Sequence, residues 1–289
     1  MRKVKAPAGG DYELSLSVRA VAQVVMADYC PRCGYLLKFL HDAYPYKMPF
    51  PGVFSVLDSV SKDVCCDFVY RLSRLPAAYR AGPVRGIAAA YTWQTFGWTY
   101  LVVDLKGTKH RVRVQGAPDV LVRLAGKRTD HAGRPATNPI AIYDNKTATL
   151  TAGQDALFPF YVAQVGGYSD IAERMGLGTC CKRGIVYWQP KATECDVDVG
   201  YEECEREQKY YKDAVKIQET KGACWFEVEM KDVTDDFRTN FPNLVQIAFQ
   251  NLWATKVPAG RAGCKNCDAI DALVHLATTK EPLEISHYI

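Results

Sequence analysis

The middle third of the sequence holds carboxylate, lysine, amide and phenol side chains at spacings that suit metal-dependent chemistry. Asp119 begins one apolar run, and Asp144 and Lys146 stand two residues apart at the end of the next. Residues i and i+2 of a strand share a face, so Asp144 and Lys146 point the same way. If these two strands pair, Asp119 joins them. The pattern therefore predicts that two carboxylates and one ammonium group converge.

Such a convergence would suit the hydrolysis of a phosphate ester. Two carboxylates offer the oxygen ligands that Mg²⁺ or Mn²⁺ prefers, and a bound ion polarises a phosphoryl oxygen. A neighbouring lysine orients the attacking water or stabilises the developing charge. Gln164 and Tyr168 are four residues apart on an expected helix, so they share a face and would contact substrate or brace the lysine. The alternative is a surface strand with an Asp–Lys pair beside an ordinary core helix.

The elements that must position these side chains follow from hydrophobic periodicity. Helical patterns cover 14–44, interrupted by Pro31, then 53–73, 156–175, 235–254 and a short segment at 269–277. Strand patterns between 98 and 146 suggest a meander of three or four strands, and further strands are expected at 183–188 and 224–230.

The cysteines form the second notable pattern. Of 11 cysteines, four occur as two pairs with ligand-like spacing, Cys30/Cys33 and Cys264/Cys267. Four thiolates can bind Zn²⁺ tetrahedrally or hold an iron–sulfur cluster, and buried thiols without metal are the alternative. An odd cysteine count, with a basic N-terminus that no long apolar run follows, predicts a protein of the reducing cytoplasm. The sequence also holds no apolar stretch long enough to cross a membrane.

Three motifs in a fixed order resemble the PD-(D/E)XK nucleases, in particular their RecB-like branch. They are a G-x-x-D motif at Gly116–Asp119 that opens a strand, a D-x-K strand at Asp144–Lys146, and a Q-x-x-x-Y helix at Gln164–Tyr168. The Cys30-Pro31 segment and the Cys264/Cys267 segment resemble the cysteine-rich ends of that branch. The resemblance implies an α/β fold with a restriction-endonuclease-like core, in which helices flank a central mixed sheet and the two ends of the chain are helical.

The resemblance also implies residue roles. Asp119, Asp144 and the backbone carbonyl of Asn145 would bind Mg²⁺ or Mn²⁺. Lys146 would position the attacking water, and Gln164 and Tyr168 would orient the strand. The cysteine pairs would hold a [4Fe–4S] cluster, with zinc as the alternative, although several members of the branch use one N-terminal and three C-terminal cysteines. A histidine that the exonuclease members carry upstream has no clear counterpart, because His41 comes early and Asp58 and Asp63 are alternatives.

The expected organisation is one structural domain with four regions. They are an N-terminal helical region with a cysteine pair (1–97), a nuclease core (98–190), an acidic insertion (191–223), and a C-terminal strand, helix and cysteine pair (224–289). The net charge of +4 permits nucleic-acid binding without requiring it. Residues 101–134 carry eight Lys and Arg against three Asp, which suggests positive charge around the site.

We therefore expect a metal-dependent nuclease, an exonuclease acting on single-stranded DNA or DNA ends. Its size and terminal cysteines are similar to those of stand-alone nucleases of CRISPR adaptation and DNA end processing or repair, which implies DNA and DNA-processing proteins as partners. One alternative is a non-catalytic DNA-binding or scaffold protein on the same fold, structured by its cysteine site. A cysteine-rich redox protein is a further alternative.

Overall fold

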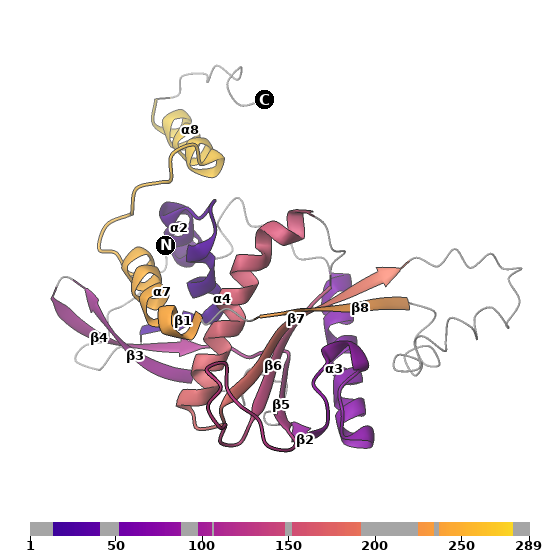
Figure 1. The fold of residues 1–289 in the computed structure, drawn as a ribbon. Helices are drawn as coiled ribbons and strands as arrows, with labels where there is room; N and C mark the ends of the chain where they lie inside the picture. The colour runs from indigo at the N-terminus through magenta and orange to yellow at the C-terminus, as the bar shows by residue number, and fades with distance from the viewer. Residues whose placement is uncertain are drawn as a thin grey trace, which may run out of the picture.

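The computed structural model describes residues 14–40, 52–87, 98–105, 107–147, 152–191, 225–233 and 237–279. Figure 1 shows a large twisted sheet with helices on both faces and a smaller sheet beside it. This arrangement confirms the expected α/β class with a central mixed sheet flanked by helices. The expected acidic insertion at 191–223 lies almost entirely outside the described residues.

The large sheet has five strands in the order β2-β5-β6-β7-β8. Their bounds are β2 (Val84–Ile87), β5 (Val120–Leu124), β6 (Ile140–Lys146), β7 (Cys180–Lys191) and β8 (Trp225–Asp232). Only β6 and β7 run parallel, and the other neighbours are antiparallel. A parallel pair needs a crossover connection, and helix α4 (Ala152–Arg174) supplies it.

The small sheet corrects the expected meander. Strands β3 (Trp98–Leu105) and β4 (Thr108–Gln115) form a hairpin, and β1 (Leu14–Ser17) pairs parallel to β4. The hairpin thus belongs to a sheet of order β1-β4-β3, separate from β5 and β6. The meander was wrong because local periodicity identifies strands but does not say which strand each one pairs with.

Both faces of the large sheet are buried, and side chains alternate between two cores. Ile140 and Ile142 on β6 face the core built with α4 and α7 (Phe237–Leu252). Ala141 and Tyr143 face a second core under α3 (Gly52–Leu72) and the 3₁₀ turn η3 (Ala77–Tyr79). By this alternation, Asp144 and Lys146 belong to the α4 face, and Asn145 belongs to the α3 face.

The N-terminal helical region differs from expectation at two places. The segment begins as strand β1, followed by α1 (Val18–Ala22), the 3₁₀ turn η1 (Gln23–Val25), and then α2 (Pro31–Leu40). Pro31 does not interrupt a helix but begins one, because the first helical position needs no backbone N–H donor. At the other end, α8 (Lys265–Thr279) lies beside α2, as Figure 1 shows.

None of the described helices combines the length and the apolar character that a bilayer crossing requires.

Candidate functional site: a carboxylate–lysine site and a four-cysteine cluster

The structure brings Asp119, Asp144 and Lys146 together, and we call these three residues the carboxylate site. Val120 on β5 opposes Tyr143 on β6, so the antiparallel register places Asp119 opposite Asp144. The backbone N–H of Asn145 donates to Oδ2 of Asp119 at 2.7 Å, and the Lys146 ammonium pairs with the Asp144 carboxylate. The strand geometry that the sequence suggested is therefore present.

A second lysine, which the sequence did not single out, also reaches this site. Lys62 on α3 places its Nζ 2.9 Å from Oδ1 of Asp119 and 2.7 Å from Oδ2 of Asp58. Burial and the neighbouring charge of Asp144 raise the pKa of Asp119 to about 6, although both lysines oppose that rise. For Lys146, burial lowers the pKa, but the two carboxylates outweigh burial and the net shift is upward. The site is thus a buried network of mutually dependent charges.

A buried hydrogen-bond network on the α3 face holds Asn145. The Tyr79 hydroxyl donates to Oδ1 of Asn145 at 2.7 Å and accepts hydrogen bonds from Nε1 of Trp188 and Sγ of Cys65, each at 3.1 Å. The Asn145 amide in turn donates to Ser61 Oγ at 3.0 Å. Since Asn145 stands between Asp144 and Lys146, these contacts fix the backbone that carries both side chains.

On the other face, α4 closes the site with Gln164 and Tyr168. Both side chains are buried, and Nε2 of Gln164 donates to the Tyr168 hydroxyl at 2.6 Å. Gly116 lets the Tyr168 ring approach the strand, because a Cβ at residue 116 would lie 2.7 Å from Cε1 of Tyr168. Burial raises the pKa of Tyr168 well above its ordinary value, so its hydroxyl stays protonated. Two turns before Tyr168 on α4, the Tyr161 ring centroid lies 4.7 Å from the Lys146 ammonium.

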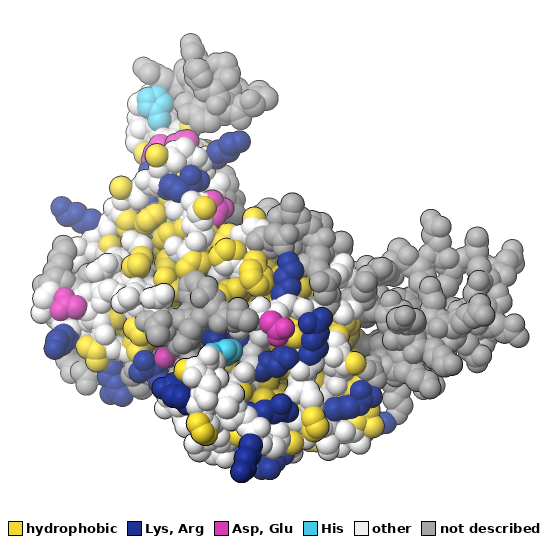
Figure 2. Space-filling model, viewed as in Figure 1, with side chains coloured by type: hydrophobic (Ala, Val, Ile, Leu, Met, Phe, Trp, Pro, Cys, Tyr) yellow, Lys and Arg dark blue, Asp and Glu magenta, His cyan; other side chains and the backbone are white. Residues whose placement is uncertain are grey.

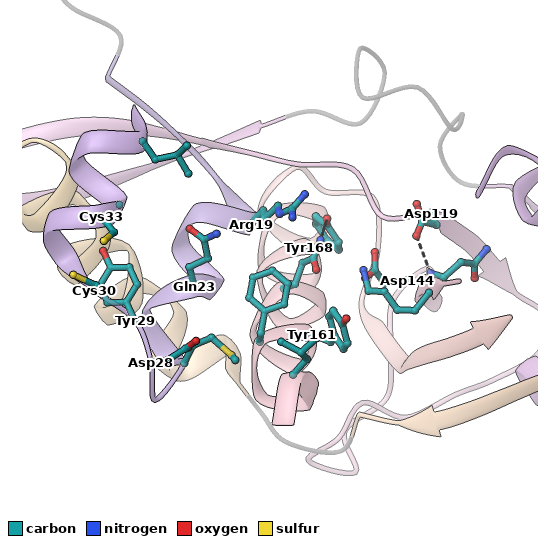
Figure 3. Close-up of a pocket in the computed structure, with 18 of the residues that line it drawn as sticks. Arg19, Gln23, Asp28, Tyr29, Cys30, Cys33, Asp119, Asp144, Tyr161 and Tyr168 are labelled. Carbon is teal, nitrogen blue, oxygen red and sulfur yellow. Dashed lines mark hydrogen bonds and ion pairs between the residues drawn. The ribbon is translucent and has the colours of Figure 1, made fainter. Parts of the chain in front are cut away.

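The carboxylate site lines one cavity of about 860 Å³, together with Asp58, Asn145, Tyr161, Gln164 and Tyr168. Lys62, Gly116 and the rest of the Tyr79 network are not part of that lining. In Figure 3 the carboxylates of Asp119 and Asp144 face each other at one end, and Cys30 and Cys33 lie at the other. Arg19 and Gln23 lie between the two ends, so the cavity wall carries both positive and neutral polar groups.

The donor set of the carboxylate site fits a hard divalent ion. Asp144 is almost fully buried, and its negative charge is one cause of the raised Asp119 pKa. A cation between the two carboxylates would relieve that repulsion, and oxygen ligands suit Mg²⁺ or Mn²⁺. To reach Asp119, the ion must compete with the Lys62 ammonium.

At the far end of the cavity, Cys30, Cys33, Cys264 and Cys267 form the cysteine cluster. Their sulfur atoms all lie within 4.8 Å of one another, so these four residues could hold a metal. Three sulfur–sulfur distances are 3.4 Å for Cys30–Cys267, 3.5 Å for Cys33–Cys264 and 3.6 Å for Cys33–Cys267. The spacing had indicated two ligand-like pairs, and the resemblance implied one cluster shared between them; the structure places the two pairs together.

Each cysteine pair stands at the start of a helix, which lowers the energy of a thiolate. Cys30 and Cys33 flank the beginning of α2, and Cys264 and Cys267 flank the beginning of α8. Burial raises the pKa of Cys30, but backbone amides, chiefly that of Arg261, and the neighbouring thiols lower it to about 6 overall. Burial, followed by hydrogen bonds with the other cysteines, raises the pKa of Cys267. One anionic sulfur is thus already favoured before any metal binds.

Two further expectations concern residues outside these clusters. Asp58 lines the cavity, where Lys62 binds it, whereas Asp63 is absent from that lining and His41 lies outside the described residues. The positive charge expected around the site is partly displaced, because Lys127, Arg128 and Arg134 follow β5 at the end away from Asp119. These cations are close to Asp119 in sequence, but the length of β5 separates them from it in space.

Comparison with known proteins gives little guidance. No protein-family model matches the chain, and no curated protein matches it. Among solved structures, the chain is similar to one described as the crystal structure of SSO0001. The two share 10% sequence identity with a TM-score of 0.38, over 86% of this chain and 80% of that one. A likeness at this level carries no functional argument, so function must be argued from the site.

Proposed function

We propose that this chain is a metal-dependent DNA nuclease of the PD-(D/E)XK type, with a restriction-endonuclease-like core. One observation carries the proposal: Asp119, Asp144 and Lys146 converge at adjoining ends of β5 and β6, in the wall of a large cavity. Gln164 and Tyr168 close the same cavity from α4. A structural ion pair would need neither the cavity nor the buried second carboxylate.

The proposed chemistry is hydrolysis of a phosphodiester bond by in-line attack of water. Asp119, Asp144 and the Asn145 carbonyl would hold Mg²⁺ or Mn²⁺, which supplies a Lewis acid for the phosphoryl oxygen and the attacking water. Lys146 donates hydrogen bonds that orient the water, and its raised pKa keeps it charged. The Tyr168 hydroxyl, held by Gln164, fixes the α4 wall against which the strand lies.

The size of the cavity favours single-stranded DNA or DNA ends as substrate. At about 860 Å³ it has room for a nucleotide or two but not for a duplex, and aromatic residues Tyr29, Phe160 and Tyr161 line it. Aromatic rings stack on bases without regard to sequence. An exonuclease that admits one free end is therefore the mode we propose.

The test is degradation of end-labelled single-stranded DNA with Mn²⁺ or Mg²⁺. We expect the wild type to cleave and Lys146→Ala to lose activity by roughly two to three orders of magnitude, as when a charge-stabilising donor is removed. Lys256→Ala, a change of the same kind at an exposed position, should retain full activity. Equal rates for Lys146→Ala and the wild type, or no cleavage by either, would overturn the proposal.

A second candidate is a DNA-binding or scaffold protein without catalysis. It is favoured by one observation: Lys62 already pairs with Asp119 and Lys146 with Asp144, so each of these carboxylates has a cationic partner without an ion. This candidate predicts DNA binding with no cleavage in any divalent metal, and no binding of Mn²⁺ by titration calorimetry. The nuclease predicts Mn²⁺ binding that Asp144→Asn abolishes.

For the cysteine cluster we propose a single zinc ion. Ligand sulfurs around a tetrahedral zinc lie about 3.8 Å apart, given a zinc–sulfur distance of about 2.3 Å. The observed 3.4–3.6 Å between three sulfur pairs is close to that value. A [4Fe–4S] cluster puts a separate iron on each thiolate, which spreads the sulfurs further. Anaerobically purified protein should contain one zinc per chain and show no absorbance band near 400 nm, and stoichiometric iron would contradict this assignment.

A further inference from the structure

A second cavity, of about 620 Å³, lies at the opposite end of the large sheet. Its lining holds four cationic residues, which we call the basic pocket: Arg80, Lys127, Arg128 and Lys182. The rest of the lining is apolar or small, with Ala81, Leu124, Thr129, Pro135 and Cys181. The nuclease chemistry proposed above uses none of these residues.

The position of the basic pocket follows from strand direction. Asp119 precedes β5, whereas Leu124 ends it, and five steps of about 3.3 Å separate these residues by roughly 17 Å. Lys182 stands near the start of β7, opposite Ala141, and so also lies toward the beginning of β6. In Figure 2, Lys and Arg side chains gather on the lower part of the molecule, where Figure 1 labels the ends of β2 and β5.

The positive charge of the pocket is only weakly neutralised within the described part of the chain. Asp232 is the carboxylate paired with Arg80 and Lys182, at 4.0 Å and 3.8 Å, and about half of its side chain is exposed. Asp130, in the same loop as Lys127, forms an ion pair with Arg134 and accepts hydrogen bonds from two backbone amides. Two of the four cations thus share one half-exposed carboxylate, and no ion pair of Lys127 or Arg128 is seen among the described residues.

Local structure holds the cations in place. Lys182 donates from Nζ to the backbone carbonyl of Arg80 at 2.7 Å, and Arg80 adopts a left-handed conformation with φ of 47°. Arg128 is half buried, and its Nε has no hydrogen-bond partner among the described residues. A buried guanidinium nitrogen without an acceptor costs free energy that an anionic ligand would recover.

The chemistry of the lining selects the ligand. Guanidinium groups bind phosphate oxygens through two parallel hydrogen bonds, and ammonium groups bind them as single positive charges. No aromatic ring lines the described pocket, so it offers no surface on which a base would stack. The roughly 17 Å between Asp119 and Leu124 equals the axial rise of about five base pairs of B-DNA, so DNA that flanks an end at the carboxylate site can extend as far as this pocket.

We propose that the basic pocket binds backbone phosphates of DNA at a distance from the scissile bond. The choice of DNA, rather than another polyanion, rests on the proposed nuclease function. In this arrangement the carboxylate site takes the end to be cleaved, and the basic pocket binds the flank of the same molecule. Contacts of this kind add affinity that falls with salt and carry no sequence information.

The test is DNA binding by fluorescence anisotropy in EDTA, where no cleavage occurs, between about 50 and 200 mM salt. The variant is Lys127→Ala combined with Arg128→Gln. We expect the slope of log affinity against log salt to fall in magnitude by about 1.4–1.8, which corresponds to two lost phosphate contacts. The control, Lys109→Ala with Arg111→Ala on β4, removes the same charge from exposed positions on the small sheet.

Each outcome decides the proposal. A smaller salt slope for the pocket variant alone supports it. An unchanged slope, an equal fall in the control, or a wild type that does not bind DNA overturns it. Poly-glutamate that binds as tightly as DNA and loses affinity in the same variant would assign the pocket to an acidic protein instead. If the double variant does not fold, Lys127→Glu alone, at an exposed position, replaces it, and the same fall in salt slope is expected. Because cleavage is not measured, an unchanged slope or an equal fall in the control leaves the nuclease proposal standing. Absence of cleavage in the separate nuclease assay likewise leaves the binding result interpretable.

Discussion

Replacing Tyr79 with phenylalanine removes one oxygen atom from the centre of the network that holds Asn145. The Tyr79 hydroxyl donates to Asn145 Oδ1 at 2.7 Å and accepts from Trp188 Nε1 at 3.1 Å, in a position with no solvent exposure. A buried polar group that loses its partner costs about 1–3 kcal/mol. Two strong partners are affected, and the Cys65 thiol adds little because it is a weak donor. We therefore expect Tyr79→Phe to lower the free energy of unfolding by about 2–4 kcal/mol.

The chain supplies a matched control in Tyr143, whose ring centroid lies 5.1 Å from that of Tyr79. Tyr143 is equally buried, but its hydroxyl has no hydrogen-bond partner within the described residues. Tyr143→Phe should therefore leave stability unchanged or raise it slightly, since it removes an unsatisfied polar atom. Urea denaturation under identical conditions measures both variants. If the two variants unfold at the same urea concentration, the reasoning about the Tyr79 network is refuted.

Three further expectations concern separate parts of the structure. Lys62→Met should lower the Mn²⁺ concentration needed for binding, because it removes a cation that competes for the carboxylates. Arg71→Met, in an exposed ion pair on the same helix, should leave Mn²⁺ binding unchanged. Calorimetry compares the two variants, and weaker Mn²⁺ binding by Lys62→Met would contradict the competition. Burial lowers the pKa of Lys38 to about 7, below its value in the unfolded chain. Above pH 7 the unfolded state therefore binds more protons than the folded state, and the free energy of unfolding should rise with pH from about 7 to 10. Lys38→Met should abolish that rise in denaturation experiments, and an identical pH profile for the variant would show that Lys38 is not its source. Gly116→Ala should lower the free energy of unfolding by about 1–3 kcal/mol, since the added methyl group would overlap the Tyr168 ring. An unchanged melting temperature would mean that the ring can move aside.

Part of this site was predictable because it depends on short-range periodicity. The two-residue spacing of Asp144 and Lys146 sets their common face, and Gln164 and Tyr168 meet because four residues make about one helical turn. Strand and helix assignments around them hold because the apolar runs are long and regular. The spacing of the cysteines also indicated a ligand set before any fold was known.

The remaining features depend on pairings between distant segments. Lys62 lies on α3, 57 residues before Asp119 in sequence, and no local pattern distinguishes it from any solvent-exposed lysine. Tyr79 likewise gains its role only when β6 and β7 pack beneath η3. The parallel pairing of β1 with β4 could not be predicted for the same reason, and residues 14–17 were themselves expected to be helical. Local sequence therefore predicted most of the elements around the site, and long-range packing decided which of them are neighbours.

The cysteine cluster has a consequence for the polymer as a whole. Cys30 and Cys267 are separated by 237 residues, yet their sulfur atoms lie 3.4 Å apart. An ion bound there would tie most of the chain into a ring. The entropy that such a cross-link removes from the unfolded chain grows only with the logarithm of ring size, and a ring of about 100 residues already gives about 4.7 kcal/mol. A chelator or an alkylating reagent would act at one edge of the molecule, but it would lower the stability of every element between the two ends, including strands that never contact sulfur.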